Sequence, residues 1–230
     1  MAVVAHGSGS SADFVERAFT RPLAAAGYQL VTWDRRGTMG DGVAQFAALA
    51  EAERPTLVGG VSSGAMLAVR YVLDNDPHPL DGLLLALPPW LGAPAAVAGM
   101  SADAASQIEN RGLAATLDDI EVSAVGWVAA ELRRAWPAYG TRALIDELRA
   151  TAQTVGPSVE DLARVTQPAG LVALAGDPFH PAAVAAQWAA AMPNAVVETI
   201  GRDAPAESVD VIGAAAVHAW QSARLLSGSQ

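Results

Sequence analysis

Apolar runs alternate with helical stretches along the first part of the chain, and this alternation constrains the fold more than any other feature. Strand-like runs occupy residues 2–5, 28–33, 56–61 and 82–87. Helical stretches connect them at residues 13–26, 42–52 and 64–73. Neighbouring parallel strands need such a crossover, and crossover helices cover both faces of the sheet. The pattern therefore predicts an α/β protein with a mostly parallel central sheet and helices on both faces.

The alternation stops after Trp90 and resumes near residue 165. Between these points only helical segments are present, at residues 102–110, 113–119, 123–136, 141–152 and 158–164. Strand-like runs return at residues 170–175 and 195–200, and helices follow them at residues 182–191 and 207–226. A helical block between strands of one sheet is typical of a lid. We predict one core formed by residues 1–90 and 165–230, with an inserted helical lid at residues 91–164.

The composition indicates a globular protein and excludes several kinds of site. Hydrophobic residues make up 52% of the chain and charged residues 17%, which is unlike a disordered segment. A net charge of −10 argues against nucleic-acid binding, which needs a basic face. The absence of cysteine excludes disulfides, thiolate nucleophiles and cysteine–metal sites. No histidine–carboxylate cluster has the spacing of metal ligands, so we expect neither a metal nor another cofactor.

The sequence also bears on location and partners. No segment approaches the roughly 20 apolar residues that a membrane helix needs. Residues 1–5 form a short apolar start without a basic region, which makes a poor signal peptide. We therefore expect a cytoplasmic protein whose partner is a small-molecule substrate and not a membrane. A homodimer is left open.

The segment Gly60-Val61-Ser62-Ser63-Gly64 is the strongest local signal for chemistry. It matches the pattern G-x-S-x-G between a predicted strand and a predicted helix, where a sharp turn exposes the central serine. The two glycines allow the close backbone approach of such a turn. The following helix N-terminus favours negative charge that develops near the Ser62 hydroxyl. Ser62 is therefore the candidate nucleophile, and the alternative is an ordinary Gly/Ser turn.

Two further polar segments follow predicted strands. His6-Gly7-Ser8-Gly9 follows the first strand, and it lacks both the lysine of a P-loop and the spacing of a dinucleotide site. Asp177 follows the strand at residues 170–175, at the sheet edge where ligands of open α/β sheets bind. Asp177 is a candidate triad acid because it comes after Ser62 in the chain. The alternative is that it caps the next helix or opens a turn with Pro178.

The chain resembles the α/β-hydrolase family over nearly its whole length. The resemblance rests on five features, which are His6-Gly7, the turn Asp34-Arg35-Arg36-Gly37, the Ser62 elbow, the helical insertion and Asp177. The chain is similar in particular to short, alanine-rich members of actinobacterial type with an Asp-Pro-x-His-Pro segment. It begins at the strand before the His6 loop, without the two antiparallel strands that often open the fold. The resemblance implies that backbone N–H groups of Ser8 and Ser63 hold an oxyanion.

One part of the family pattern is missing. Members usually carry the catalytic histidine in the loop after the last strand, often as Gly-His, but residues 200–205 contain no histidine. His78 and His218 are expected away from the elbow, and His6 is expected beneath the oxyanion loop. His180, in the proline-flanked loop of the candidate acid, is the best candidate for the general base. The alternative is that it is a loop residue and that triad hydrolysis has been lost.

Tryptophans and helix charges carry weaker signals. Trp33, Trp90 and Trp127, with Trp136, are predicted to line an apolar pocket between lid and sheet, and core filling is the alternative. Ordinary ion pairs on single helix faces are predicted for two groups: Glu131 with Arg133 and Arg134, and Asp146 with Arg149.

Together these features predict a serine hydrolase that acts on an ester, thioester or lactone of a modest-sized apolar substrate. Ser62 would attack the acyl carbon, His180 would carry the proton and Asp177 would orient His180. Two alternatives stay open. One is the same fold without triad hydrolysis, as a small-molecule binding protein, a lyase or a cyclase. The other is a protein-interaction module that uses the lid.

Overall fold

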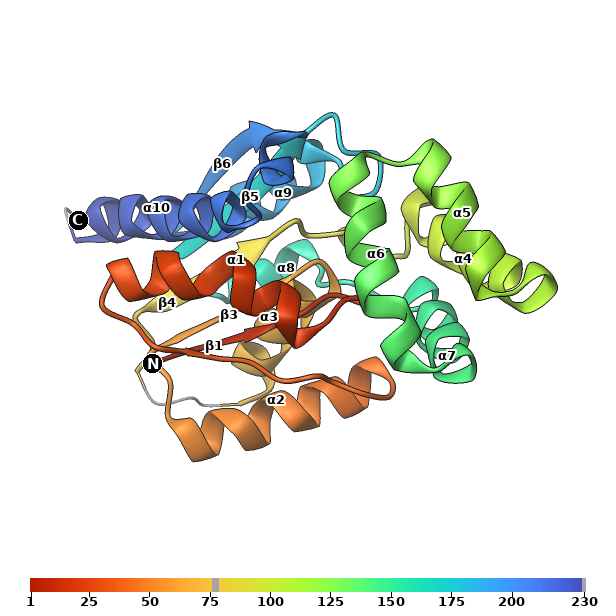
Figure 1. Ribbon diagram of the computed structural model, residues 1–230. Helices are drawn as coiled ribbons and strands as arrows, with labels where there is room; N and C mark the ends of the chain where they lie inside the picture. The colour runs from red at the N-terminus through yellow and green to blue at the C-terminus, as the bar shows by residue number, and fades with distance from the viewer. Residues whose placement is uncertain (76–78, 229–230) are drawn as a thin grey trace.

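The computed structural model describes residues 1–75 and 79–228 and shows one parallel sheet between two layers of helices (Figure 1). The sheet has six strands in the order β2-β1-β3-β4-β5-β6, and every neighbouring pair is parallel. The strands are β1 (Ala2–Ala5), β2 (Leu30–Val31), β3 (Leu57–Val61), β4 (Gly82–Ala86), β5 (Ala169–Ala175) and β6 (Ala195–Gly201). The predicted α/β class with a parallel sheet is confirmed.

Helices occupy every connection between these strands. They are α1 (Ala12–Ala25), α2 (Met39–Glu53), α3 (Ser63–Asp74), α4 (Ala96–Arg111), α5 (Leu113–Ser123), α6 (Gly126–Tyr139), α7 (Thr141–Ala152), α8 (Val159–Ala163), α9 (Ala182–Ala191) and α10 (Asp210–Ser227), with a 3₁₀ turn η1 (Ala204–Ala206). Local capping explains several starts. The Ser11 side chain accepts from the N–H of Phe14, and Thr38 with Asp41 forms a reciprocal capping box.

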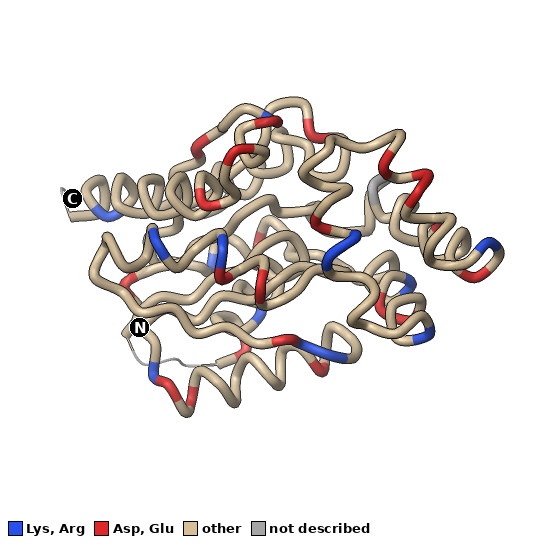
Figure 2. Tube along the Cα trace, in the orientation of Figure 1, with Lys and Arg blue, Asp and Glu red and all other residues tan. Residues whose placement is uncertain are grey.

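The core consists of two apolar layers, one on each face of the sheet. Successive strand residues point to opposite faces, so Val3 and Ala5 belong to one layer while Ala2 and Val4 belong to the other. Helices α2, α3, α8 and α9 complete the first layer, and α1 and α10 complete the second. Of the residues in the strands only Glu198 is charged, and the charges elsewhere lie on helices and loops (Figure 2).

The strand order creates one edge position that is suited to a site. The chain runs from β1 outwards to β2, then returns across β1 to β3 on its other side. Loops that leave β1 and β3 therefore diverge to opposite faces, and this switch point at the carboxyl ends of the two strands is where open α/β sheets bind ligands. His6-Gly7-Ser8 follows β1 there, and Ser62 follows β3.

Helices α4–α7 form a block between β4 and β5, which we name the helical insert. The insert lies beyond the carboxyl ends of the strands (Figure 1) and has its own buried apolar cluster, which includes Ile108, Trp136 and Leu144. Helix α8 differs, because its Leu162 packs in the core layer with Trp188. The prediction that the inserted segment acts as a lid stays a prediction.

Charged residues of the insert correct the predicted ion pairs. Glu131 is buried and pairs with Arg17 of α1, so it fastens α6 to the core instead of pairing with Arg133 or Arg134. The other partners are also different: Arg133 pairs with Asp118 and Glu121, Arg134 with Asp13, Asp146 with Arg142, and Arg149 with Glu109. Most of these partners come from neighbouring helices, which spacing along one helix misses, whereas Arg142 and Asp146 are an i,i+4 pair on α7 itself.

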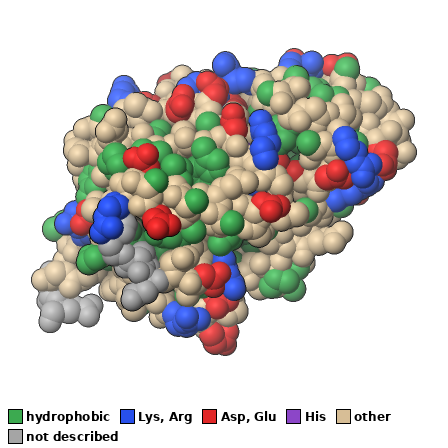
Figure 3. All heavy atoms as spheres, turned by 90° about the horizontal axis from the view of Figure 1, so that it is seen from below, with side chains coloured by type: hydrophobic (Ala, Val, Ile, Leu, Met, Phe, Trp, Pro, Cys, Tyr) green, Lys and Arg blue, Asp and Glu red, His purple; other side chains and the backbone are tan. Residues whose placement is uncertain are grey.

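The molecular surface mixes charges of both signs with hydrophobic side chains on the face seen from below (Figure 3). Across the described residues, the helices are too short or too polar to cross a bilayer. The expectation for His78 falls outside the described residues.

Candidate active site

Ser62 stands on a strained turn between β3 and α3. Its backbone has φ 56° and ψ −122°, a conformation that non-glycine residues rarely adopt and that costs of order 1–3 kcal/mol. The turn is tight because the flanking glycines have no room for a side chain. A Cβ on Gly60 would lie 2.1 Å from the carbonyl carbon of Gly64, and one on Gly64 would lie 2.4 Å from the oxygen of Ala5. This sequence therefore forces the Ser62 hydroxyl out at the head of α3.

His180, the predicted base, reaches Ser62 from the loop after β5. His180 Nε2 lies 2.9 Å from Ser62 Oγ, and His180 Nδ1 lies 3.1 Å from Asp177 Oδ2. A carboxylate only accepts hydrogen bonds, so Nδ1 carries the ring hydrogen and Nε2 is free to accept from the Ser62 hydroxyl. The three side chains that the sequence predicts as nucleophile, base and acid are thus brought together in one hydrogen-bonded line.

The environment of Asp177 keeps it ionised. Burial acts to raise its pKa, but hydrogen bonds and charge from His180 and the backbone N–H groups of Phe179 and His180 outweigh this and lower it. One of these contacts joins the Phe179 N–H to Asp177 Oδ1 at 2.8 Å and closes a short turn. The turn explains how the Asp177 carboxylate can reach the ring of His180, only three positions away, while that ring faces Ser62.

The other two described histidines lie away from this line. His6 is buried and donates from Nδ1 to the oxygen of Gly7 at 2.8 Å, while its Nε2 accepts from the N–H of Arg35 at 3.0 Å. Burial and, next, the charge of Arg35 lower the pKa of His6 from 6.5 to about 4, so the ring is neutral. His218 is exposed on α10 and pairs with Glu198.

The loop after β1 lies against the nucleophile. A Cβ on Gly7 would be 3.0 Å from Ser62 Cβ, so a side chain there would crowd Ser62. The N–H of Ser8, predicted as an oxyanion donor, donates to the Ser63 hydroxyl at 2.8 Å. The N–H of Ser63, the second predicted donor, opens α3 and has no hydrogen-bond partner among the described residues.

Arg35 is the residue of this site that sequence reasoning missed. It follows β2, and its guanidinium is buried behind Ser8 and Ser63. Its Nη2 donates to Ser8 Oγ at 2.9 Å and to Ser63 Oγ at 3.1 Å, and it lies 2.8 Å from Glu147 Oε1 of α7. Burial raises the pKa of Glu147, although Arg35 acts against this. The only sequence signal was the Asp34–Gly37 turn, which does not show which arginine points inwards.

Comparisons with known proteins identify the family of the chain. The sequence model of the Alpha/beta hydrolase family matches residues 2–217. The chain belongs to this family. A comparison with curated proteins gives no match.

Solved structures show the same fold as this family member at low sequence identity. MenH from S. aureus has a TM-score of 0.76 and 16% identity, over 97% of this chain and 94% of that chain. The enol-lactonase from Burkholderia xenovorans LB400 has a TM-score of 0.72 and 14% identity, over 96% and 90%. A thermophilic esterase from Thermogutta terrifontis has a TM-score of 0.69 and 14% identity, over 99% and 89%. At these identities the likeness shows the fold alone.

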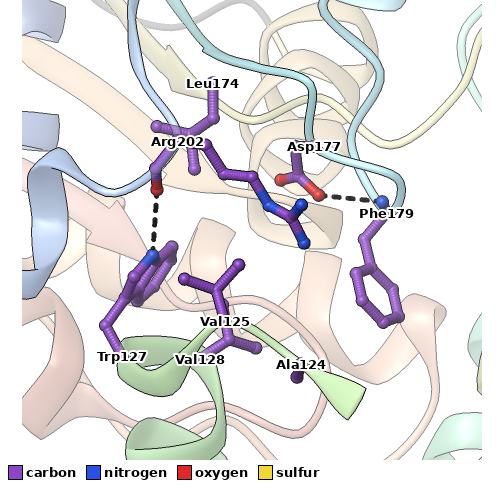
Figure 4. Close-up of a pocket in the computed structure, with 8 residues that line it drawn as sticks. All are labelled: Ala124, Val125, Trp127, Val128, Leu174, Asp177, Phe179 and Arg202. Carbon is purple, nitrogen blue, oxygen red and sulfur yellow. Dashed lines mark hydrogen bonds between the residues drawn. The ribbon is translucent and has the colours of Figure 1, made fainter.

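A small pocket of this alpha/beta hydrolase adjoins the acid (Figure 4). It lies between the insert and the loops after β5 and β6, and its lining is Ala124, Val125, Trp127, Val128, Leu174, Asp177, Phe179 and Arg202. Trp127 donates from its indole N–H to the oxygen of Arg202 at 3.0 Å. Arg202 stands in the loop where family members usually keep histidine, and its side chain extends towards Asp177 (Figure 4).

The predicted tryptophans are not gathered in one pocket. Trp127 lines the pocket beside Asp177, whereas Trp90 is buried in the core layer and donates to the oxygen of Thr154. Trp33 packs edge-on against Phe46 and donates to Gln45. Trp136 is buried in the cluster of the insert. Among the described residues, no three histidine, aspartate or glutamate side chains are close enough together to hold a metal ion.

Proposed function

We propose that this alpha/beta hydrolase is a serine hydrolase that acts on an ester, thioester or lactone of a small apolar substrate. The observation that carries the proposal is the line from Ser62 Oγ to His180 Nε2 at 2.9 Å and from His180 Nδ1 to Asp177 Oδ2 at 3.1 Å. A serine hydroxyl is a poor nucleophile until an adjacent base takes its proton. This geometry supplies such a base at hydrogen-bond distance.

Each residue then has one task in acyl transfer. Ser62 attacks the acyl carbon while its proton moves to His180, and His180 returns that proton to the leaving oxygen or sulfur. Asp177 holds the ring in the required tautomer and stabilises the charged imidazole. Backbone N–H groups of Ser8 and Ser63 hold the oxyanion. Water then attacks the acyl group, while His180 takes a proton from the water and returns it to Ser62, the leaving oxygen.

Two observations support the proposed substrate class. The pocket beside Asp177 is lined mainly by apolar side chains, among them Val125 and Trp127, which favours a small apolar acyl or leaving group. An esterase and an enol-lactonase among the similar structures are compatible with ester or lactone chemistry.

Intact-mass labelling with a fluorophosphonate tests the proposal. Such a probe phosphonylates an activated serine, and we expect one rapid addition to the native protein that is lost in Ser62→Ala. We also expect labelling about 100 to 10,000 times slower in His180→Ala, which is the 10²–10⁴-fold worth of a general base. His218→Ala is the matched control, because His218 also pairs with a carboxylate but on the exposed face of α10.

Two outcomes would contradict the proposal. If the native protein is not labelled while a small apolar ester binds to it, the fold serves as a binding protein, a lyase or a cyclase without triad hydrolysis. If His180→Ala is labelled as fast as the native protein, Ser62 has a different base.

A further inference from the structure

The resting site holds a hydrogen bond that conflicts with oxyanion binding. In the proposed function the N–H of Ser8 donates to the oxyanion. In the structure this N–H donates to the Ser63 hydroxyl at 2.8 Å. One N–H makes one strong hydrogen bond at a time, so the hydroxyl and the oxyanion compete for it.

Hydrogen-bond counting fixes the direction of this hydroxyl. Arginine has only donors, so Arg35 Nη2 must donate to Ser63 Oγ, which lies 3.1 Å away. Together with the Ser8 N–H this fills both lone pairs of Ser63 Oγ. The hydroxyl hydrogen of Ser63 is then left for Ser8 Oγ at 2.9 Å. The Ser63 hydroxyl is therefore an acceptor towards the Ser8 N–H and has no hydrogen to offer an oxyanion.

The row of hydrogen bonds continues from Ser8 to the helical insert. Ser8 Oγ accepts from Ser63 and from Arg35 Nη2, so its own hydrogen points to Thr151 Oγ1 of α7 at 2.5 Å. Both hydrogens of Nη2 are now in use, which agrees with the finding that Glu147 Oε1 meets Arg35 as an ion pair without a hydrogen bond. One buried cation thus sets the direction of two hydroxyl groups in a row, those of Ser63 and Ser8.

Burial keeps this arrangement in place. Arg35 and Ser63 are almost without exposed surface, and Glu147 and Thr151 of α7 cover them. The partner of the Ser8 N–H, the Ser63 hydroxyl, is itself buried and accepts from Arg35, and hydrogen bonds to a charged donor are stronger than neutral ones. Buried side chains of the protein therefore stabilise this hydrogen-bonded arrangement in the resting state.

We propose that the Ser63 hydroxyl caps the Ser8 N–H and closes the oxyanion site in the resting protein, with Arg35 directing the cap. Before an oxyanion can form, the hydroxyl must turn away from this N–H. The inference rests on the proposed function, because it concerns the donor that the function assigns to Ser8. It deepens that function by identifying a group of the protein, the Ser63 hydroxyl, that competes with the oxyanion for the Ser8 N–H.

A matched pair of variants tests the cap. Ser63→Ala and Ser8→Ala each remove one hydroxyl from the same row, but only Ser63→Ala frees the Ser8 N–H. Phosphonylation by a fluorophosphonate places an oxygen in the oxyanion site, so its second-order rate constant reports on the free donor. We expect Ser63→Ala to react about two- to tenfold faster than the native protein, since a hydrogen bond of ordinary net strength has been removed. Ser8→Ala should not react faster, because its N–H stays capped.

A second measurement separates this inference from the proposed function. Hydrogen exchange of the Ser8 amide, followed by NMR, should be faster in Ser63→Ala than in the native protein. Ser8→Ala is the reference variant, because it also loses a hydroxyl from this row. If no variant reacts with the probe, the proposed function fails and the amide exchange still tests the cap. The cap is overturned if folded Ser63→Ala reacts no faster than the native protein, or if its residue 8 amide is equally protected.

Discussion

The two sides of Ser62 are built differently. On one side the base and its acid come from a single loop after β5, and their side chains keep 21% and 11% of their surface exposed. On the other side Arg35, Ser63 and Glu147 come from separate elements, and each is at most 6% exposed. The base side is thus local and open, whereas the oxyanion side is assembled by the tertiary fold and is dry.

This difference predicts different consequences of mutation. A change on the base side removes chemistry without leaving an unpaired buried group, so the fold should tolerate it. A change on the oxyanion side removes a partner from a buried polar network, and such unpaired groups are costly. Mutations on the base side should therefore lower the reaction rate, whereas mutations on the oxyanion side should lower the free energy of unfolding.

Arg35→Met is expected to have the largest effect on stability. The variant leaves Glu147 buried without its cation and takes the shared donor from Ser8 and Ser63. Breaking a buried ion pair by removing one partner costs about 3–5 kcal/mol. Urea unfolding should therefore show a loss of about 3 kcal/mol or more.

Arg36→Met is the matched control for this experiment. Arg36 is the next residue, but it is exposed and stacks on the Tyr139 ring, 4.8 Å from its centre. Its replacement should lower the free energy of unfolding by no more than about 1 kcal/mol. Equal losses in the two variants would mean that the buried network adds no stability, and the contrast between the two sides would disappear.

Sequence reasoning succeeded where function depends on strand ends. Ser62 directly follows one predicted strand and Asp177 lies two residues beyond the end of another. Parallel strands bring their carboxyl ends to one edge, so the position of both residues at that edge could be foreseen. His180 could be foreseen because it belongs to the same loop as Asp177. The helices at residues 141–152 and 182–191 also match, since alanine in the second, and leucine, arginine, glutamate and alanine in the first, favour helix wherever they pack.

Sequence reasoning failed where tertiary contacts decide. Nothing in the local sequence distinguishes buried Arg35 from exposed Arg36, because contacts in the folded protein decide the direction of each side chain. The partner of Glu131 is more than 100 positions away, at Arg17. The predicted strand at residues 28–33 shrinks to Leu30–Val31, because β2 is an edge strand that pairs only with β1.

Asp177→Asn sharpens the contrast from the base side. An amide N–H facing His180 would favour the tautomer with hydrogen on Nε2, which cannot accept from Ser62. We expect kcat/KM for a small ester to fall about 100-fold or more, with a change of less than about 1 kcal/mol in the free energy of unfolding. Glu198→Gln is the control, since Glu198 holds the exposed His218 in a similar pair. A collapse of stability in Asp177→Asn would show that the base side is not local after all.

The smallest expected effect is a dependence of stability on pH that comes from His6, on the buried side. Burial, then Arg35, and to a lesser degree Arg36 lower the pKa of His6 to about 4 in the folded protein, against 6.5 when unfolded, while Asp34 acts in the opposite direction. Between these values the unfolded chain binds more protons, so acid favours unfolding. The contribution is complete above pH 6.5 and is lost as the pH falls, by about 2 kcal/mol between pH 7 and pH 5. Urea unfolding at both pH values should show this loss in the native protein and in His218→Asn, and a smaller loss in His6→Asn. An unchanged loss in His6→Asn would place the acid sensitivity elsewhere, and the buried side would then owe none of its stability to a neutral imidazole.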